Sequence, residues 1–238
     1  MSPARRGIRR SANLFRAFRL EQSRPDVFYG ALAADSVDLV SEWTDLHGAT
    51  VLDVGAGPAE FARAFRAAGS HYVPIDHDGS VASIRDGGLV ATAAALPIAD
   101  RCVDVVFSSN LWEHVADPEP VADELVRVLR PGGLLFLSYT NWLSPWGGHE
   151  TSPWHWLGGE RAVRRYTRRH GHRPKNVVDE SLYRISVARG LRWANAQPEV
   201  EVLVARPRYL PDAARHLLRV PGLREILTWN LLLVLRRR

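Results

Sequence analysis

A chain of 238 residues is long enough for one sizeable α/β domain, or for such a domain with a lid. Its hydrophobic fraction of 46% and charged fraction of 24% are ordinary for a globular protein. Cys102 is the only cysteine, which excludes an intrachain disulfide and a cysteine-based metal site, and we expect it to be a small core residue.

The net charge of +5 is carried almost entirely by arginine, since Lys175 is the only lysine. This composition is more typical of a GC-rich genome than of a nucleic-acid partner, so it is weak evidence for binding RNA or anionic membranes. No apolar segment follows the basic N-terminus, and the apolar run Leu231–Leu235 is far too short to span a bilayer. We expect a cytoplasmic protein without a transmembrane segment.

Residues 1–48 are predicted to form an N-terminal helical cap. Residues 1–24 are rich in arginine, and three apolar side chains give them a helical stripe: Leu14, Phe15 and Phe18. We favour a solvated helix that covers the domain over an anchor on a membrane or polyanion. A second amphipathic helix is predicted over residues 27–43.

Residues 51–62 combine a strand, a glycine turn and the start of a helix. Gly55 and Gly57 permit backbone angles closed to other residues and let a ligand approach the main chain. Pro58 suits the first turn of the helix that follows. This pattern is the nucleotide-binding corner of a doubly wound α/β fold.

The corner departs from a dinucleotide-binding fingerprint. Glu60 stands where the third glycine would allow close packing, and Asp53 places a carboxylate where a pyrophosphate would lie. An acidic strand residue suits a ligand that is cationic near the turn. The chain also lacks a Tyr-x-x-x-Lys pair, because no tyrosine stands four residues before Lys175. An NAD(P) oxidoreductase is therefore disfavoured.

Residues 71–76 are predicted to be the second strand, with Asp76 at its carboxyl end. An acidic residue at this place holds ribose hydroxyls in doubly wound folds. Asp78 is the alternative, and either aspartate could instead form an Asx turn or cap a helix. A weak helix over Ser80–Arg85 and a short strand over Leu89–Ala93 are expected next.

A β-branched run over residues 103–108 predicts a central parallel strand. Residues 109–115 leave its carboxyl end, where ligands gather in open α/β sheets. An amphipathic helix over residues 118–129 and a strand over residues 134–139 follow. The alternation of strands and helices places residues 49–238 in one α/β domain.

The composition changes over residues 140–175. Tryptophan and histidine accumulate there, at Trp142, Trp146, Trp154, Trp156, His149, His155, His170 and His172. So long a connection is usually a lid or a substrate loop, and we expect a lid over residues 140–177 with a helix at 159–170. Its tryptophans form either the core of the lid or stacking surfaces for sugar rings.

The C-terminal part predicts two further helices and two further strands. The helices are expected over residues 186–194 and 211–218, and the strands over residues 200–205 and 228–235.

Three blocks resemble the class I S-adenosylmethionine (SAM) methyltransferases. They are Val-Leu-Asp-Val-Gly-Ala-Gly at 51–57, the stretch from Ala-Leu-Pro-Ile-Ala-Asp to Val-Asp-Val-Val at 95–106, and Val-Leu-Arg-Pro-Gly-Gly-Leu at 128–134. The resemblance implies a Rossmann-like fold with a seven-stranded, mostly parallel sheet, an antiparallel last strand and helices on both faces. It also implies a lid inserted after strand five, and SAM as the cofactor.

The resemblance also implies contacts with SAM. Asp53, Gly55, Ala56 and Gly57 would approach its methionine part. The remaining implied contacts run from the ribose through the adenine to the methyl-bearing sulfur: Asp76, His77, Ala93, Ala94, Leu96, Asn110 and Leu111. Thr92 departs from the family, which often has an acidic residue there for the adenine amine.

Residues 138–140, 146–150, 170–176 and 190–193 resemble a small actinobacterial group of these enzymes. The group includes the mycobacterial sugar O-methyltransferase of methylmannose polysaccharide synthesis, which acts at an anomeric hydroxyl. A mannoside or a methylated mannose oligosaccharide is the implied acceptor, with another small molecule or a lipid as the alternative. A nucleic-acid acceptor is less consistent, since no Asn-Pro-Pro-Tyr-type motif follows strand four. A homodimer is possible.

A sugar hydroxyl is a poor nucleophile and benefits from a general base with a pKa near the working pH. His149, which follows a flexible glycine pair, is our first candidate, and His114 is the second. Either could instead be a structural or surface histidine. The expected acceptor contacts are Glu113, Tyr139, Trp146, Glu150, Trp154 and His155. Glu113, Glu150 and the histidines could alternatively bind Mg²⁺, although no spacing is diagnostic of a metal.

Overall fold

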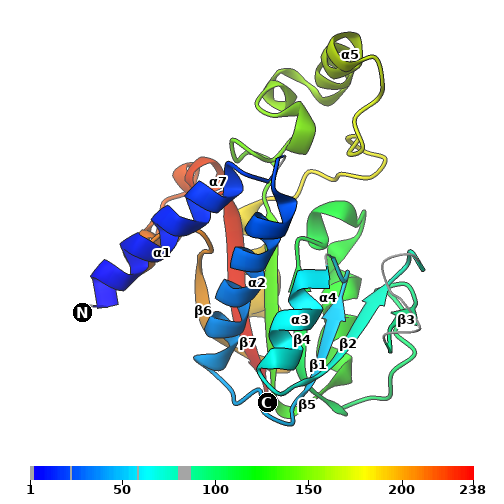
Figure 1. The fold of residues 1–238 in the computed structure, drawn as a ribbon, viewed down its shortest axis with the longest axis vertical. Coiled ribbons are helices and arrows are strands. Elements are labelled where there is room, and N and C mark those ends of the chain that lie inside the picture. The colour runs from blue at the N-terminus through cyan, green and yellow to red at the C-terminus, as the bar shows by residue number, and fades with distance from the viewer. Residues whose placement is uncertain (1–2, 22, 58, 80–86) are drawn as a thin grey trace.

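The computed structural model describes residues 3–21, 23–57, 59–79 and 87–238. Its centre is a seven-stranded sheet with helices on both faces (Figure 1). The strands are β1 (Thr50–Val54), β2 (His71–Asp76), β3 (Leu89–Val90), β4 (Val103–Ser109), β5 (Leu129–Thr140), β6 (Val200–Pro207) and β7 (Asn230–Arg237).

The strand order is β3-β2-β1-β4-β5-β7-β6. The pairs β1–β2, β1–β4, β2–β3 and β4–β5 are parallel, and β7 runs antiparallel to both β5 and β6. The prediction of a seven-stranded, mostly parallel sheet with an antiparallel last strand is confirmed. The order reverses direction between β1 and β4, so the carboxyl ends of these strands border a crevice suited to a ligand.

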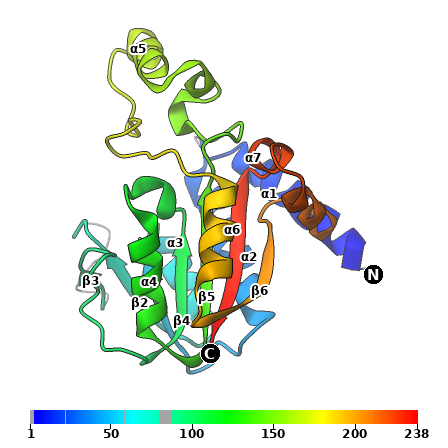
Figure 2. The same ribbon diagram turned by 180° about the vertical axis from the view of Figure 1, so that it is seen from behind.

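The α-helices are α1 (Pro3–Phe18), α2 (Pro25–Ser41), α3 (Ala59–Ala67), α4 (Pro118–Val128), α5 (Gly159–His170), α6 (Val187–Ala196) and α7 (Leu223–Leu227). Short 3₁₀ helices are η2 (Trp112–His114), η3 (His149–Thr151), η4 (Trp154–Leu157) and η5 (Asp212–Arg219). α2 and α3 cover the sheet face seen in Figure 1, and α4 and α6 cover the face seen in Figure 2.

Strand β4 shows why the sheet is buried on both faces. Val105 and Phe107 pack into the core beneath α2 and α3, whereas Val103 and Val106 pack into the core beneath α4 and α6. A strand with two apolar faces cannot lie at a surface without exposing one of them, so it takes a central position.

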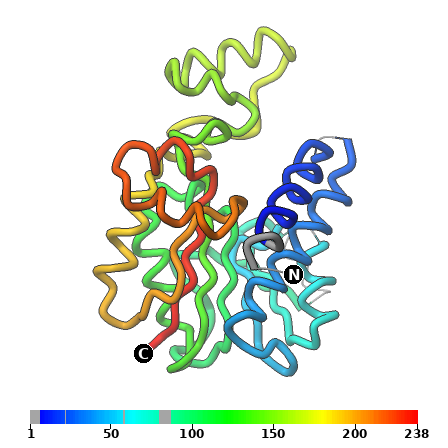
Figure 3. Tube along the Cα trace, turned by 90° about the vertical axis from the view of Figure 1, so that its left-hand side faces the viewer, coloured from blue at the N-terminus to red at the C-terminus, as the bar shows by residue number. Residues whose placement is uncertain are grey.

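Helix α1 is fastened to α2 and to the end of β6. The Arg10 guanidinium forms an ion pair with Asp35 and also donates a hydrogen bond to the Arg208 carbonyl oxygen, at 2.9 Å. Leu14 is buried in the same core as α2 and the sheet. Helix α1 also borders the site described below. Figure 3 shows α5 and its neighbouring turns beyond the edge of the sheet.

Several local expectations differ from the structure. β5 begins at Leu129, and the predicted Arg-Pro-Gly-Gly turn lies within its bounds, at an irregularity between the pairs Val103–Leu129 and Val105–Leu134. β3 has only 2 residues, residues 212–219 form a 3₁₀ helix, and α7 was not anticipated. Cys102 is exposed, so its assignment to the core is wrong; its Sγ donates to the Ala99 carbonyl at 3.1 Å. The expected helix at Ser80–Arg85 and the role of Pro58 lie outside the described residues.

Within the described ranges, no helix has the length and apolar character needed to cross a bilayer.

Candidate active site

The carboxyl ends of the central strands open onto a cleft of ≈ 2230 Å³. The cleft begins at the glycine turn after β1 and continues beneath residues 140–177, the predicted lid, and alongside α1. Its cofactor half, as we call it here, is lined by Asp53, Gly55, Ala56, Gly57, Asp76, His77, Asn110 and Leu111. The sequence predicted each of these residues as a cofactor contact.

The glycine turn is closed by its own backbone. The amides of Gly55 and Ala56 both donate to the Ile75 carbonyl, at 2.9 and 3.0 Å. Gly55 has a φ of +78°, and a Cβ there would lie 3.0 Å from a Leu111 methyl carbon. A Cβ on Gly57 would meet nothing within 4 Å. Gly55 therefore shapes the turn, while Gly57 leaves open space for a ligand.

Asp53 is a buried carboxylate on β1. It is 2% exposed and accepts a hydrogen bond from the Tyr72 hydroxyl. Burial raises the pKa of Asp53 to about 7, against the opposing effect of that hydrogen bond. A cationic ligand would favour the ionised form. No sequence pattern marked Tyr72, whose position opposite β1 follows from strand pairing.

Asp76 lies at the end of β2, as predicted. One carboxylate oxygen accepts a hydrogen bond from the Asp78 amide at 2.9 Å and lies 3.1 Å from His77 Nδ1. This is an Asx turn, so the structural alternative for Asp76 is present as well. Both aspartates and His77 line the cleft.

The loop predicted to lie along an adenine is tied to α4. The Leu96 amide donates to Glu124 at 2.6 Å, and Ala94 has a longer bond of 3.4 Å to the Thr92 hydroxyl. Ala93 packs against the core. Because the Leu96 amide already has a partner, it is not a free donor for a purine.

Asn110 organises the end of β4. Its φ is +60°, a conformation that asparagine tolerates better than most residues. Its Nδ2 donates to Glu113 Oε1 at 2.9 Å and to the Thr140 hydroxyl at 3.0 Å. Glu113 is 1% exposed, and the same oxygen accepts the Thr140 amide at 3.0 Å. Thr140 was missed, although it directly follows the predicted fifth strand.

The two candidate histidines meet at this end of the cleft. The rings of His114 and His149 are 5.1 Å apart between centroids. His114 Nδ1 is 2.7 Å from the Ser181 carbonyl oxygen, so Nδ1 carries the proton of this bond, and in the neutral ring the lone pair is on Nε2. His149 has a φ of +48° and a buried Nε2 that has no hydrogen-bond partner among the described residues. Burial lowers the pKa of His149 to about 4 and keeps it neutral at pH 7.

Glu113, His114 and His149 form the only group of three or more His, Cys, Asp or Glu in the described ranges that could hold a metal ion. One potential ligand atom from each lies within 4.8 Å of the other two. We call these three residues the Glu-His-His cluster. It borders Asn110 and Leu111, where the resemblance places the methyl-bearing sulfur.

Comparisons with known proteins identify the family. A family model described as a methyltransferase domain matches residues 52–137. A protein from Mycolicibacterium gilvum, described as an uncharacterized methyltransferase, is 51% identical over an alignment covering 96% of this chain and 94% of the relative. The chain belongs to the class I SAM-dependent methyltransferases.

Two solved structures share the methyltransferase fold at low sequence identity. A SAM-dependent methyltransferase from Mesorhizobium loti has a TM-score of 0.57 and 16% identity, covering 86% of this chain and 98% of its own. A structure described as a putative SAM-dependent methyltransferase from Listeria monocytogenes has a TM-score of 0.58 and 18% identity, covering 87% and 97%.

The cofactor half of this methyltransferase fits SAM chemically. Asp53 offers a buried carboxylate to a cation, and the open space at Gly57 admits a group against the main chain. Asp76 offers a carboxylate to the ribose hydroxyls at the end of β2. The SAM contacts remain predictions residue by residue.

The predicted acceptor contacts divide into two sets. Trp146 and Glu150 line the cleft together with His114 and His149, whereas Glu113 is buried behind them and is not among the lining residues. Both Glu150 oxygens lie near Asn176 Nδ2, at 3.0 and 3.1 Å. Tyr139 is instead fully buried beneath the cleft, and its hydroxyl donates to the Ser186 carbonyl at 2.8 Å.

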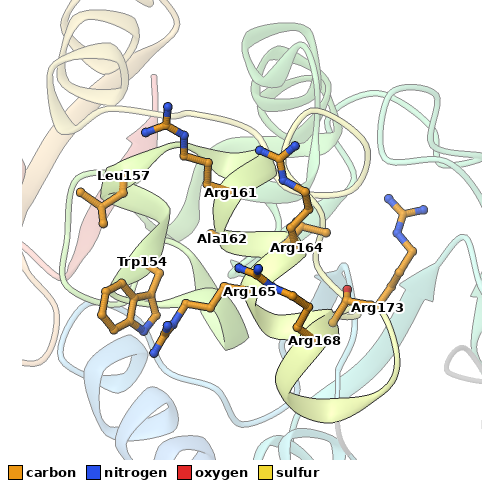
Figure 4. Close-up of a pocket in the computed structure, with 10 residues that line it drawn as sticks. Trp154, Leu157, Arg161, Ala162, Arg164, Arg165, Arg168 and Arg173 are labelled. Atoms are coloured by element: carbon orange, nitrogen blue, oxygen red, sulfur yellow. The ribbon is translucent and has the colours of Figure 1, made fainter.

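Trp154 and His155 lie in the lid and are not among the residues that line the main cleft. The Arg165 guanidinium stacks 3.9 Å from the Trp154 ring, beside a hollow of ≈ 880 Å³ bordered by arginines of α5 (Figure 4). His155 is 1% exposed, with Nε2 3.0 Å from the Trp142 carbonyl oxygen. In this structure the two residues hold the lid together.

Arg208 is a fully buried guanidinium that the sequence did not single out. It donates to Ser36, Ser109 and Ser138, each at 2.7 Å. These bonds join α2 to the ends of β4 and β5 immediately behind Asn110. No local pattern marks this residue, because its three partners are distant in sequence.

The cleft also has an apolar arm that the sequence did not predict. It is formed where α1 and α2 meet the lid and the segment before β7, and its apolar side chains include Phe15, Phe18, Phe28, Leu32, Trp146 and Trp229. Trp146 packs against Phe18 and Trp229, with ring centroids 5.0 and 6.2 Å apart.

Proposed function

We propose that this methyltransferase transfers a methyl group from SAM to a hydroxyl oxygen, with a sugar as the acceptor. The observation that carries the proposal is the Glu-His-His cluster beside Asn110 and Leu111. SAM, when bound, supplies an electrophilic methyl group whose departure leaves the electron pair on sulfur. The chain must hold the acceptor oxygen in line and receive its proton.

The Glu-His-His cluster offers a route for that proton. His149 is neutral at pH 7, and its unpartnered Nε2 can accept a hydrogen bond from the acceptor hydroxyl. As the carbon–oxygen bond forms, the proton passes to His149, and the nearby Glu113 carboxylate stabilises the resulting imidazolium. Asn110 and the Thr140 amide orient that carboxylate.

The narrower assignment is a mannoside or methylated mannose oligosaccharide, with the anomeric 1-hydroxyl as acceptor. It is supported by the resemblance of residues 138–193 to the sugar methyltransferase group. The half-exposed Trp146, 39% exposed in the cleft, suits stacking on the apolar face of a sugar ring. We place this activity in the cytoplasm, without a nucleic-acid acceptor and with a homodimer as the possible assembly.

A second acceptor class is favoured by the apolar arm of the cleft. Phe15, Phe18 and Trp229 give that arm more apolar surface than a sugar alone would use. A lipid or an acceptor with a long apolar chain would bury this surface while presenting a hydroxyl to the Glu-His-His cluster.

A methyl-transfer screen tests both classes. Labelled SAM is incubated with mannosides, partly methylated mannosides, other glycans and hydroxylated lipids, and products are read by mass. Transfer to a mannoside hydroxyl supports the first proposal, and transfer only to lipid hydroxyls supports the second. Methylation of nitrogen or carbon alone contradicts both. Calorimetry with SAM checks that the protein used in the screen binds its cofactor.

A further inference from the structure

The donor atoms of the Glu-His-His cluster are held from outside the cluster. Glu113 Oε1 accepts hydrogen bonds from Asn110 Nδ2 and the Thr140 amide, and this leaves Oε2 buried without a partner among the described residues. The Glu113 carbonyl also accepts the Tyr183 amide at 2.7 Å. Asn110 and Thr140 thus fix the carboxylate, and Tyr183 holds the main chain of Glu113. The second carboxylate oxygen has no partner among the described residues.

The two imidazoles of the cluster also have nitrogen atoms available to a ligand. The Ser181 carbonyl oxygen accepts the proton on His114 Nδ1, so that in the neutral ring Nε2 is the nitrogen with a lone pair available to a metal ion. His149 Nε2 is likewise buried and unpartnered within the described part of the chain. A buried polar atom without a partner is costly, so two such atoms in one cluster indicate a missing ligand.

We propose that Glu113, His114 and His149 bind one divalent transition-metal ion of the Zn²⁺, Fe²⁺ or Mn²⁺ class, and not Mg²⁺. Two imidazole nitrogens and one carboxylate oxygen are the donor set of such ions, whereas Mg²⁺ prefers oxygen ligands in octahedral geometry. A carbonyl that orients the ligating histidine through its other nitrogen is a recurrent feature of these sites.

The cluster does not match an oxygen-rich magnesium site. Glu150, the second carboxylate that such a site would need, is not part of the group whose atoms converge. It interacts instead with Asn176 at 3.0 Å. A second carboxylate therefore does not reach the other donors in the described structure.

The role of the ion rests on the proposed O-methyl transfer. Three protein ligands leave open coordination positions, and an acceptor hydroxyl bound there would lose its proton more readily than in water. The proton would leave to solvent or to a cleft residue as the carbon–oxygen bond forms and the carbon–sulfur bond breaks. With the ion bound, His149 would be a ligand, so this proposal replaces the proton transfer to His149 described above and keeps only the methyl transfer to a hydroxyl oxygen. Metal binding itself does not depend on which acceptor is used.

The test is direct metal binding to the full-length, chelator-treated protein. Co²⁺ is titrated as a spectroscopic substitute, and the visible absorption of imidazole-bound cobalt is recorded; bound Zn²⁺, Mn²⁺ and Mg²⁺ are then measured by elemental analysis after dialysis. One Co²⁺ or Zn²⁺ per chain, with no retention of Mg²⁺, is expected. Retention of Mg²⁺ alone, or of no metal, overturns the proposal.

Variants locate the ion. Glu113→Gln and His149→Ala should each abolish the cobalt spectrum, and Asn110→Ala, which removes an orienting bond, should weaken cobalt binding by about 10–100-fold. His216→Gln, at an exposed histidine of η5, is the matched control and should bind as the unchanged protein does. Circular dichroism and SAM calorimetry confirm folding, and Glu113→Gln decides the question if His149→Ala unfolds. Unchanged cobalt binding in Glu113→Gln would place the ion elsewhere.

Activity separates this proposal from the proposed function. Stoichiometric metal binding without methyl transfer to any hydroxyl would uphold the site and reject O-methylation. Methyl transfer that persists after chelation, with no cobalt binding, would uphold O-methylation and reject the ion.

Discussion

The two halves of the cleft are built in different ways. The cofactor half comes from strand ends that follow one another closely in the chain, and its turn is closed by backbone bonds from Gly55 and Ala56 to Ile75. The acceptor half brings together α1, the lid and the segment before β7, so that Phe18, Trp146 and Trp229 touch. The first half is local structure, and the second is tertiary packing.

The two halves of the cleft are therefore positioned by different physical constraints. Strand ends in a parallel sheet must meet at one edge, so a strand-turn-helix segment places its own ligand contacts. The side chains of the predicted lid and α1 are instead placed by contacts between segments that are distant in sequence, such as Phe18 with Trp146. The cofactor therefore follows from the fold, whereas the acceptor depends on how the lid and α1 pack.

The largest expected effect is at the acceptor half. His149→Ala should reduce turnover by about 10²–10⁴-fold, the usual contribution of a positioned proton acceptor or of an equivalent activating ligand. SAM affinity should be unchanged, because His149 lies outside the contacts predicted for the cofactor. Turnover under saturating SAM and calorimetry measure the two quantities. His216→Gln is the control, and near-normal turnover of His149→Ala would transfer the role to His114.

Asp53→Asn, in the cofactor half, should change SAM affinity and the free energy of unfolding in opposite directions. The folded-state pKa of Asp53 is about 7, above its ordinary value of 3.8, so the folded protein prefers the protonated form. Its contribution to stability is present below about pH 4 and is lost as pH rises to 7. The amide of the variant has no such titration, so the cofactor-free variant should be the more stable protein at pH 8, by a few kcal/mol at most, on the order of the pKa shift.

SAM binding should change in the opposite direction, because the variant loses its negative charge. Denaturant unfolding at pH 5 and 8 and calorimetry with SAM measure both effects. A variant that binds SAM normally would contradict the pairing of Asp53 with a cationic group.

Sequence reasoning placed strands and turns correctly where one segment contains the whole feature. Residues 51–57 carry strand, turn and glycine positions together, and Asn110 to His114 follow directly from a predicted strand. His114 and His149 were both proposed, and the fold brings them together. Trp229 and Arg208 could not be found, because their importance arises from partners on other elements. Tyr139 and His155 have site-like side chains, yet their packing is decided by burial, which the sequence does not show.

The two glycines of the turn provide a smaller, sharper test. Gly57→Ala should leave stability unchanged and weaken SAM binding by about tenfold or more, since its Cβ would enter open space reserved for a ligand. Gly55→Ala should lower the free energy of unfolding by about 1–2 kcal/mol, since a left-handed φ is costly for alanine. Thermal unfolding and calorimetry compare them. Equal loss of stability in both variants would show that Gly57 is also structural.

The smallest expected effect distinguishes the cleft from the outer face of the lid. Trp146→Ala should raise KM for the acceptor by about fivefold, with kcat and SAM affinity retained, because an aromatic contact is worth roughly 1 kcal/mol. Trp156→Ala is the matched control: Trp156 is 49% exposed, compared with 39% for Trp146, but it does not line the cleft. If both variants raise KM equally, the acceptor extends over the lid. If Phe15→Ala also raises KM, the acceptor occupies the apolar arm, which a sugar of one or two rings would not require.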